Sequence, residues 1–514
     1  MKTNQIKAGA ILNYVQLFVG VIISLSIHQT IINKIGISEN GILNMATNAI
    51  SYLNLLNLGL GSAFIRFNMK YRVAGDIEGE QKLNGLFLIF YLIIAVLMAI
   101  CGTGIVLGAD SIFVEFTSSE IVTLKKVMSI ILIQSCMNLL GSVFTMNINS
   151  RERFIFAKSV SILNTILLPL GKLAVVLNGY KAIGIALVTC AFSFAVIIIE
   201  GFYAIFRLKI RFKFGKIEKG LIKSIFAFSF FIFLNQIIDM INWQIDTLVL
   251  GVVSGTAAVA VYSIASGLNS YVLTFSTAIS SVLVPRVNML VASNASKEEI
   301  NGLFVKTGRI QFAILGLVML GYIFFGKAFI VNFFANEEYV NAYYIGLLII
   351  LPLIVPLIQN VGIEIQRAYN KHKFRSIAYT IMALVNLGMS IPLGIYYGAI
   401  GCAIGTCVSL LLGNGLIMNI YYHQKIGINI IAFWKSILRF VPALIIPISV
   451  GVVMMLYVDL SNVWWFLLSI AGFSVIYCIS MYLFGLNSDE RDKINNKFSK
   501  LKKKKARVDV NDGE

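Results

Sequence analysis

Long runs of apolar residues, separated by short polar or charged segments, recur from one end of the chain to the other. A run of about 20 residues is long enough to cross a bilayer core about 30 Å thick. Backbone polar groups in lipid must be satisfied within the segment, so such runs form helices. The pattern predicts an all-α polytopic membrane protein with about fourteen transmembrane helices. The expected spans are 9–33, 41–65, 84–107, 126–148, 155–177, 182–206, 224–250, 257–284, 310–333, 341–366, 376–397, 400–422, 438–457 and 463–486.

Composition supports membrane residence. Of the 514 residues, 58% are hydrophobic and 13% are charged, whereas soluble domains contain about 25% charged residues. The six cysteines lie in apolar segments without the spacing of metal ligands and are interpreted as small core residues. The three histidines are too scattered for a metal site, so no metal and no cofactor are expected.

The formal net charge of +18 is compatible with a nucleic-acid partner or with basic cytoplasmic loops. If residue 1 is cytoplasmic, 36 of the 42 Lys and Arg residues fall on cytoplasmic segments. This bias is the positive-inside rule. It predicts a protein of the cytoplasmic (inner) membrane with both termini in the cytoplasm, an uncleaved first span, and no nucleic-acid partner. The six exceptions are Lys34, Lys125, Lys126, Lys172, Lys181 and Lys327.

A faint internal repeat suggests how the spans are grouped. Gly36 and Arg66 flank the second span much as Gly251 and Arg286 flank the eighth. Both copies start from the cytoplasm, so the repeat is parallel. The predicted organisation is an N-terminal lobe (1–206), a basic cytoplasmic linker (207–223), a C-terminal lobe (224–423), an appended helix pair (424–486) and a basic cytoplasmic tail (487–514).

Polar residues follow one helical face in the first two spans of each predicted lobe, judged at about 100° per residue. Such stripes predict an aqueous cavity shared by these four helices, although Ser, Thr, Asn and Gly also hold helices together. The stripes contain Asn13, Gln16, Gly20, Ser24 and His28; Asn44, Asn48, Ser51, Ser62 and Arg66; Asn235, Asp239, Asn242 and Asp246; and Ser263, Ser266, Ser270, Thr274, Thr277 and Ser281.

Asp239 argues most strongly for a cavity. It lies about 22 Å from the cytoplasmic start of its span at 1.5 Å per residue, too deep to reach that surface. An ionised Asp near mid-bilayer costs about 2.5–3.5 kcal/mol, so it needs water, a partner or a proton. The candidate substrate-binding residues from the stripes are Asn44, Asn48, Asn235, Asp239, Asn242, Asp246 and Ser270.

Lys172 in the fifth span shares a face with Ser161 and Thr165. Its long side chain could extend to the outer surface or pair with an acid across the cavity, and both interpretations stay open. Arg66 and Arg286 follow the cavity-facing second and eighth spans, where they could equally be ordinary loop cations.

Several short motifs resemble the polysaccharide repeat-unit flippases (Wzx-type), which belong to the superfamily of MATE exporters and lipid II flippases. The resemblance rests on Asn13-Tyr14, on the segments Ile35–Gly41 and Leu58–Ala63, and on Arg66. In the second half it rests on Trp243–Gly251, Val261–Ala265 and Pro285.

The resemblance implies a MATE-like fold and movement of an undecaprenyl-diphosphate-linked oligosaccharide to the outer leaflet by alternating access, for O-antigen, capsule or other surface polysaccharide. It implies that Arg66, Lys172 and Arg286 hold the diphosphate. The first span lacks the arginine of the lipid II flippases, which favours a repeat-unit substrate. Implied partners are membrane lipids, a polysaccharide polymerase and glycosyltransferases. The coupling ion, H⁺ or Na⁺, stays open.

Two alternatives belong to other classes. A MATE-type drug exporter shares the architecture but would need an acid-rich site and usually twelve spans. A membrane enzyme would need an extended outer loop with catalytic residues, and the longest one here is about Gly108–Lys125. No phosphate-binding Gly loop, nucleophile elbow or metal motif is present, so the protein is not expected to be an enzyme.

Overall fold

The computed structural model describes residues 2–215, 219–281, 287, 289–291, 293, 295–369, 371, 373–488, 490–492 and 495. These residues form helices joined by short connections, and no β-strand occurs among them. The chain separates into two compact units. Unit 1 runs from the start to Gly267 and includes Ile330–Ile349 and Ser376–Ser409. Unit 2 contains Leu268–Phe329, Ile350–Arg375 and the chain from Leu410 onward.

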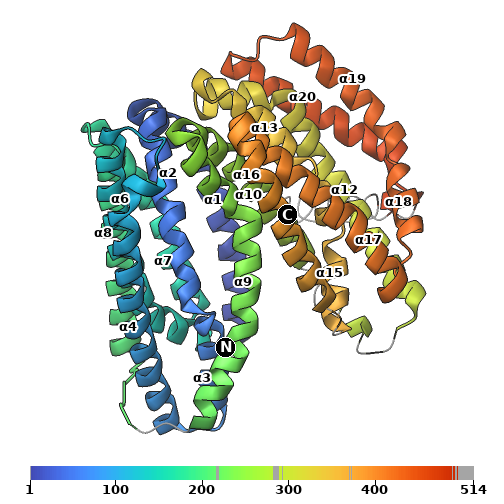
Figure 1. Cartoon of the computed structure of the whole chain (residues 1–514). Helices are drawn as coiled ribbons and strands as arrows, with labels where there is room; N and C mark the ends of the chain where they lie inside the picture. Colours follow the sequence, from blue (N-terminus) through green and yellow to red (C-terminus); the bar gives the residue numbers. More distant parts are fainter. Residues whose placement is uncertain are drawn as a thin grey trace, which may run out of the picture. The chain divides into compact units, whose positions relative to one another are not determined.

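Unit 1 is built around long helices that pack side by side. Helix α6 contacts α2, α4 and α8, and α1 packs along α7 (Figure 1). The bounds are α1 Lys2–Ile35, α2 Ile37–Ser51, η1 Tyr52–Asn57, α3 Leu60–Val73, α4 Ile77–Leu107, α5 Ala109–Ile112, α6 Ser118–Ser150, α7 Phe154–Leu177, α8 Ala182–Phe202, η2 Tyr203–Arg207, α9 Lys219–Val253, α10 Gly255–Ser281 (which continues into unit 2), η3 Phe329–Phe334, η4 Glu337–Tyr339, α13 Asn341–Ile350 and α16 Lys373–Leu410.

The second predicted span is interrupted. Helix α2 ends at Ser51, the tighter turn η1 follows, and α3 starts only at Leu60. Leu58 and Gly59 between them have φ values of 50° and 70°, a left-handed conformation that favours glycine. A Cβ atom on Gly59 would lie 2.5 Å from Cγ2 of Ile232. The break therefore also lets α9 approach closely.

The eleventh predicted span and the first half of the twelfth lie in α16, which is a helical hairpin; the twelfth continues past Leu410, where α16 ends. Gly398 lies inside α16 with φ 57° and ψ −137°, a conformation that is not helical and that only glycine adopts readily. The flanking helices come close: a Cβ atom on Gly401 would lie 1.9 Å from the Leu393 carbonyl oxygen. The hairpin brings residues 386–390 close to residues 402–406.

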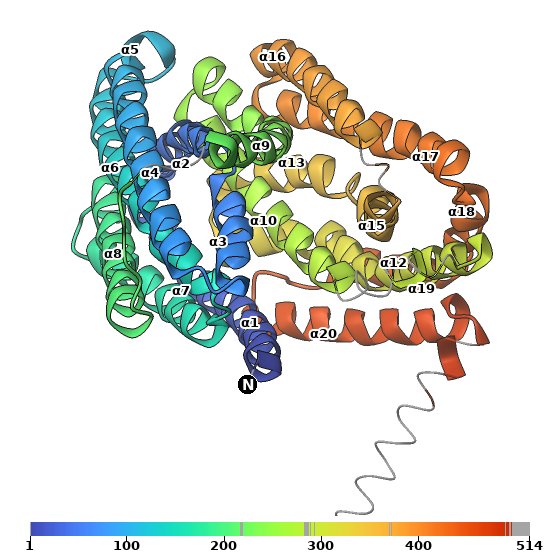
Figure 2. The same ribbon diagram turned by 90° about the horizontal axis from the view of Figure 1, so that it is seen from below.

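Unit 2 contains helices of the second half of the chain. Helix α12 packs against α18, α19 and α20 (Figure 2). The bounds are α12 Lys297–Ala328, α14 Ile354–Ile358, α15 Asn360–Ala368, η5 Leu411–Ile417, α17 Met418–Tyr421, η6 Tyr422–Ile426, α18 Ile430–Leu438, α19 Val441–Tyr457, α20 Val463–Ser480 and η7 Met481–Gly485.

A buried arginine ties the last helices of unit 2 together. Arg309 of α12 is 2% exposed and donates from two nitrogens to the Glu490 carboxylate, at 2.9 and 2.8 Å. It also donates to the carbonyl oxygens of Ser436 and Gly485 and lies 4.4 Å from the ring centre of Phe440. The guanidinium, the carboxylate and the two carbonyl groups would each be costly to bury without a partner, so Arg309 fixes the position of the C-terminal helices on α12.

The fold class predicted from the sequence is confirmed: the described chain is a polytopic helical membrane protein. Eight described helices are long and apolar enough to cross a membrane, or nine if the bent pair α18 and α19 is one span. The count of fourteen is not confirmed. One candidate stretch of 53 residues, Phe374–Ile426, contains the hairpin of α16 and therefore more than one crossing. The division into two six-helix lobes and an appended pair stays a prediction.

Candidate functional site

A cavity of about 370 Å³ lies within unit 1, between α2 and its extension η1 on one side and α6, α7 and α8 on the other. Its described lining contains one charged side chain, Lys172, and no carboxylate. Volumes of this order are typical of small-molecule sites. The polar residues that line it are Asn44, Thr47, Ser51, Asn54, Gln134, Ser135, Lys172 and Thr189; the apolar ones are Leu43, Ile131, Ile185 and Ala186.

Lys172 extends into this cavity from α7. The ammonium group makes no ion pair with the described residues. Helix α7 is held in place by α1, where the Gln16 amide donates to the hydroxyls of Ser161 and Thr165 at 3.2 and 3.3 Å. A lysine placed in this way can bind an anion as a compact point charge.

The asparagines of α2 are arranged along one face of that helix. The Asn44 amide donates to the Asn40 carbonyl oxygen at 2.9 Å, and the Asn48 amide donates to the Asn44 carbonyl oxygen at 2.9 Å. Ser51, one turn further, donates to the Gln244 side chain of α9 at 2.9 Å. Asn44 therefore lines the cavity with its amide donor engaged on its own helix, while Asn48 is half-buried outside the lining.

The other predicted site residues lie apart from this cavity. Arg66 is exposed on α3, with its guanidinium carbon 4.6 Å from the ring centre of Phe228. Asn242 is half-buried and Ser270 is exposed, and both have interaction partners. Arg286 and the side chains of Asn235 and Asp239 lie outside the described residues. The substrate-binding roles of all ten residues stay predictions.

Asp246 occupies a second polar site, in which a buried carboxylate is surrounded by hydroxyl and amide oxygens. Tyr262 donates to its Oδ2 at 2.5 Å, and Thr406 of α16 donates to the same oxygen. The Asn386 side-chain oxygen lies 3.3 Å from the Thr406 hydroxyl and accepts from Ser390 at 3.0 Å. Carbonyl, hydroxyl and carboxylate oxygens are the ligands of hard cations. This cluster can therefore hold a proton or a small hard cation such as Na⁺.

At the predicted outer end, one glutamate joins three helices. Glu120 lies in the first turn of α6, where its carboxylate accepts from the Thr117 backbone N–H at 2.9 Å. Its other oxygen accepts from Ser38 of α2 at 2.5 Å and from Thr256 of α10 at 2.7 Å. The helices touch here, because a Cβ atom on Gly41 would lie 2.0 Å from the Thr256 carbonyl oxygen. We call the contact of these five residues the outer contact.

Further hydrogen bonds reinforce the same end of unit 1. The Gln29 side chain of α1 donates to the Asn332 carbonyl oxygen at 2.7 Å, and Asn40 donates to the Tyr339 hydroxyl at 3.2 Å. Asn336 donates to the side chain of Asn33 at 2.9 Å. The first two helices are thus bonded to segments that follow them by some 300 residues.

Unit 2 contains an apolar pocket of about 360 Å³ between α10, α12 and α20. Its walls are mainly aromatic and aliphatic, so it can accommodate hydrocarbon but offers few groups to a charged ligand. The lining includes Leu268, Val272, Leu317, Val318, Tyr322, Phe325, Phe329, Phe466, Ile470 and Phe473.

A family of polysaccharide biosynthesis proteins matches residues 8–291, more than half of the chain. The chain belongs to this family. A comparison with curated proteins found no match. The suspected kinship with repeat-unit flippases is thereby confirmed at the level of the family, and multi-pass membrane residence agrees with it.

Solved structures share the fold of this chain over most of its length. The lipid II flippase MurJ in an inward closed conformation is 17% identical, with a TM-score of 0.70 over 93% of this chain and 98% of that one. An inward-facing MATE multidrug transporter is 14% identical, with a TM-score of 0.64 over 83% and 99%. The Vibrio cholerae MATE transporter VcmN in its bent form is 13% identical, with a TM-score of 0.54 over 84% and 99%. At these identities the likeness shows the MATE-like fold of this family member.

Sequence reasoning missed several residues of this family member's sites. Gln134, Ser135 and Thr189 line the cavity from α6 and α8, but each is an isolated polar residue in a long apolar run. Glu120 lies in the longest predicted outer loop, and only the spacing Thr117-x-x-Glu120, a helix capping box, could have indicated its position. Thr406 joins Asp246 across 160 residues, a contact that no local pattern reveals.

Proposed function

We propose that this protein is a flippase that moves undecaprenyl-diphosphate-linked oligosaccharide repeat units from the cytoplasmic to the outer leaflet by alternating access. The cavity of unit 1 is the observation that carries the proposal. It combines one lysine with neutral amides and hydroxyls. A lysine binds phosphate, and amides and hydroxyls can exchange hydrogen bonds with sugar hydroxyls.

The apolar pocket of unit 2 supports a substrate with a lipid part. A polyprenyl chain can stay in hydrocarbon throughout transfer, while the diphosphate and sugars need a polar route. The apolar walls lined by Phe325, Phe466 and Phe473 suit such a chain. A cationic drug, the substrate of a MATE-type exporter, would instead require a carboxylate in the cavity, and the described lining has none.

The outer contact supports alternating access. With Glu120 holding Ser38 and Thr256, the predicted outer end of unit 1 is closed in this conformation. We propose that this end of unit 1 opens and closes during transport, in a cytoplasmic membrane with both termini inside. Opening this end would break the hydrogen bonds to the Glu120 carboxylate, each of which contributes about 1.5–3 kcal/mol. Binding or release of a ligand can supply a free energy of this size.

Deletion of the gene is the direct test. The expected result is that lipid-linked repeat units accumulate on the cytoplasmic leaflet and surface polymer is lost. Extraction of lipid-linked sugars, with an impermeant glycosidase added to intact cells, measures which leaflet holds them. Normal polymer together with altered tolerance to cationic drugs would contradict the flippase and favour the exporter. Re-expression of the wild-type chain is the control for effects on neighbouring genes.

We further propose that the Asp246 cluster binds the coupling ion, a proton or Na⁺. An unaccompanied carboxylate is costly to bury, and Asp246 is 4% exposed, so a cation should accompany it in this state. Asp246→Asn keeps the size and accepts a hydrogen bond from Tyr262 or Thr406, but it carries no charge. We expect transport to fall at least tenfold.

The response of transport to an imposed ion gradient is the measurement for this variant. In vesicles, wild-type transport should respond to an imposed pH gradient or to an imposed Na⁺ gradient, and the gradient that acts identifies the ion. Asp246→Asn should respond to neither. The control is Asp110→Asn, because Asp110 is an exposed acid that pairs with Lys125. Wild-type rates and gradient dependence in Asp246→Asn would refute the assignment.

A further inference from the structure

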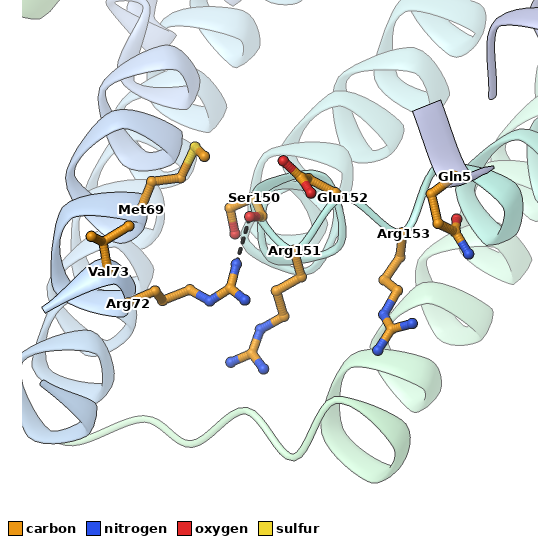
Figure 3. A pocket seen from close by; sticks show the side chains of 8 residues that line it. All are labelled: Gln5, Met69, Arg72, Val73, Ser150, Arg151, Glu152 and Arg153. Carbon is orange, nitrogen blue, oxygen red and sulfur yellow. Dashed lines mark hydrogen bonds between the residues drawn. The ribbon is translucent and has the colours of Figure 1, made fainter. Parts of the chain in front are cut away.

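A second charged pocket lies in unit 1, at the end of the bundle where α3 ends and α6 turns into α7. It encloses about 490 Å³ and is lined by three arginines from two separate segments. Figure 3 shows it from close by. The sequence places both segments in predicted cytoplasmic connections, after the second and the fourth spans. The lining residues are Gln5, Met69, Arg72, Val73, Ser150, Arg151, Glu152 and Arg153.

Two of these arginines are held in place by the fold. Arg72 donates to the Ser150 carbonyl oxygen at 2.6 Å. Arg151 donates to the Glu80 carboxylate at 2.6 Å and to the Leu208 carbonyl oxygen at 3.1 Å. The Nε of Arg151 is buried and has no hydrogen-bond partner among the described residues. The side chains are thus oriented in advance, with donor capacity left over.

Arg153 is the member of the pocket with the most donor capacity left. Its guanidinium forms no ion pair with the described residues, and it is exposed. Glu152 between the two arginines has φ 56°, a left-handed conformation that is uncommon for a residue with a side chain. In Figure 3, Arg151 and Arg153 point the same way from this turn, whereas Glu152 lies on its other side. The turn therefore gathers positive charge.

The charges in the pocket do not cancel. Burial, followed by the positive charge of Arg151, lowers the pKa of Arg72. The negative charges of Glu80 and Glu152 oppose this, and Arg153 adds a smaller lowering. The Glu80 carboxylate already forms an ion pair with Arg151, at 2.6 Å, and so neutralises one of the three guanidinium charges. A bound anion would relieve the repulsion among the three guanidinium groups. Planar guanidinium groups are well matched to phosphate oxygens, which they bind through two parallel hydrogen bonds.

The rim of the pocket is apolar. Met69 is 40% exposed, Val73 is 88% exposed and Ile77, just beyond, is 69% exposed. Exposed apolar side chains beside a row of arginines are typical of the membrane interface, where anionic headgroups attract basic residues. The ligand that fits both parts of the pocket carries phosphate and hydrocarbon together.

We propose that this pocket binds the phosphate group of a lipid at the cytoplasmic surface, with Arg72, Arg151 and Arg153 as its ligands. Two lipids offer this chemistry: an anionic membrane phospholipid and the polyprenyl diphosphate carrier. The site is separate from the Lys172 cavity, and lipid binding there does not depend on whether the protein is a flippase.

Native mass spectrometry of the purified full-length protein in detergent tests the proposal. The probes are phosphatidylglycerol, undecaprenyl diphosphate without sugar, and phosphatidylcholine as a lipid of zero net charge. The wild-type protein is expected to retain one of the two anionic lipids in preference to phosphatidylcholine. Arg153→Gln should lower the affinity for that lipid about tenfold, and the double variant Arg72→Gln with Arg153→Gln should lower it further.

The matched control is Arg211→Gln, an exposed arginine in a predicted cytoplasmic segment that does not line the pocket. Stronger retention of undecaprenyl diphosphate would identify the carrier as the ligand, and stronger or equal retention of phosphatidylglycerol would identify a membrane headgroup. The proposal is overturned if the double variant retains both anionic lipids as well as Arg211→Gln does. Circular dichroism establishes that each variant is folded, and because no transport is measured, the outcome is independent of the deletion experiment.

Discussion

Replacing Lys172 by alanine is expected to lower transport of the lipid-linked repeat unit about ten- to hundredfold. Lys172 is the one charged group in the described lining of the cavity. A hydrogen bond to a charged group contributes about 1.5–3 kcal/mol, and each 1.4 kcal/mol changes an equilibrium tenfold. Transport is measured in the deletion strain as the fraction of repeat units that an external glycosidase reaches.

Two further variants separate charge from packing. Lys172→Arg keeps the positive charge and should restore much of the activity that Lys172→Ala loses. Lys327→Ala removes an exposed lysine of α12 and should leave transport unchanged. If Lys172→Ala moves repeat units at the wild-type rate, the diphosphate is not bound in this cavity.

Gly41→Ala is expected to stop transport altogether by preventing the outer contact from forming. The added Cβ would lie 2.0 Å from the Thr256 carbonyl oxygen and 2.6 Å from its carbonyl carbon. Both are backbone atoms, which cannot rotate away as a side chain can. The helices must move apart, so the outer contact is lost.

The matched control is Gly104→Ala in α4, where nothing lies within 4 Å of the new Cβ. Alanine is the better helix former by about 0.5–1 kcal/mol, so this variant should be fully active.

Closure of the outer contact is measured with Asn40→Cys, in a background whose six native cysteines are replaced by serine. Asn40 is 8% exposed, so an impermeant thiol reagent should label it slowly. Gly41→Ala should make labelling fast, and slow labelling with normal transport would show that the outer contact is not a gate.

Much of this arrangement could be predicted from the sequence. Apolar runs and the distribution of basic residues indicate a polytopic membrane protein, and the polar face of the second span pointed to Asn44. Lys172 stood out because a lysine in an apolar span is costly. These inferences use local periodicity, which a single sequence displays directly.

Other features depend on contacts between distant segments. Asp246 continues a polar stripe, and its role in substrate binding stays a prediction. Its burial by hydrogen bonds from Tyr262 and Thr406 has no local signal in the sequence. The helix break at Leu58-Gly59 left no clear signal, because glycine is common in spans and is usually helical there. The turn at Gly398, in contrast, falls in the gap between the predicted spans 376–397 and 400–422. The cavity's far wall could not be predicted, since isolated polar residues such as Gln134 equally well join helices.

Helix α2 has a role that follows from its two sets of neighbours. Its first turns contain Ser38, Asn40 and Gly41, which contact neighbouring segments at the predicted outer end of unit 1. Its later turns contain Asn44, Thr47 and Ser51, which line the Lys172 cavity. A rigid displacement of this helix would therefore change access and ligand affinity together. By linkage, a ligand that binds one access state more tightly must shift the balance between the states by the same free energy. A substrate bound equally tightly in both access states would leave the equilibrium between them unchanged. Selectivity among sugars would therefore be seen as a difference in how far each sugar shifts that equilibrium.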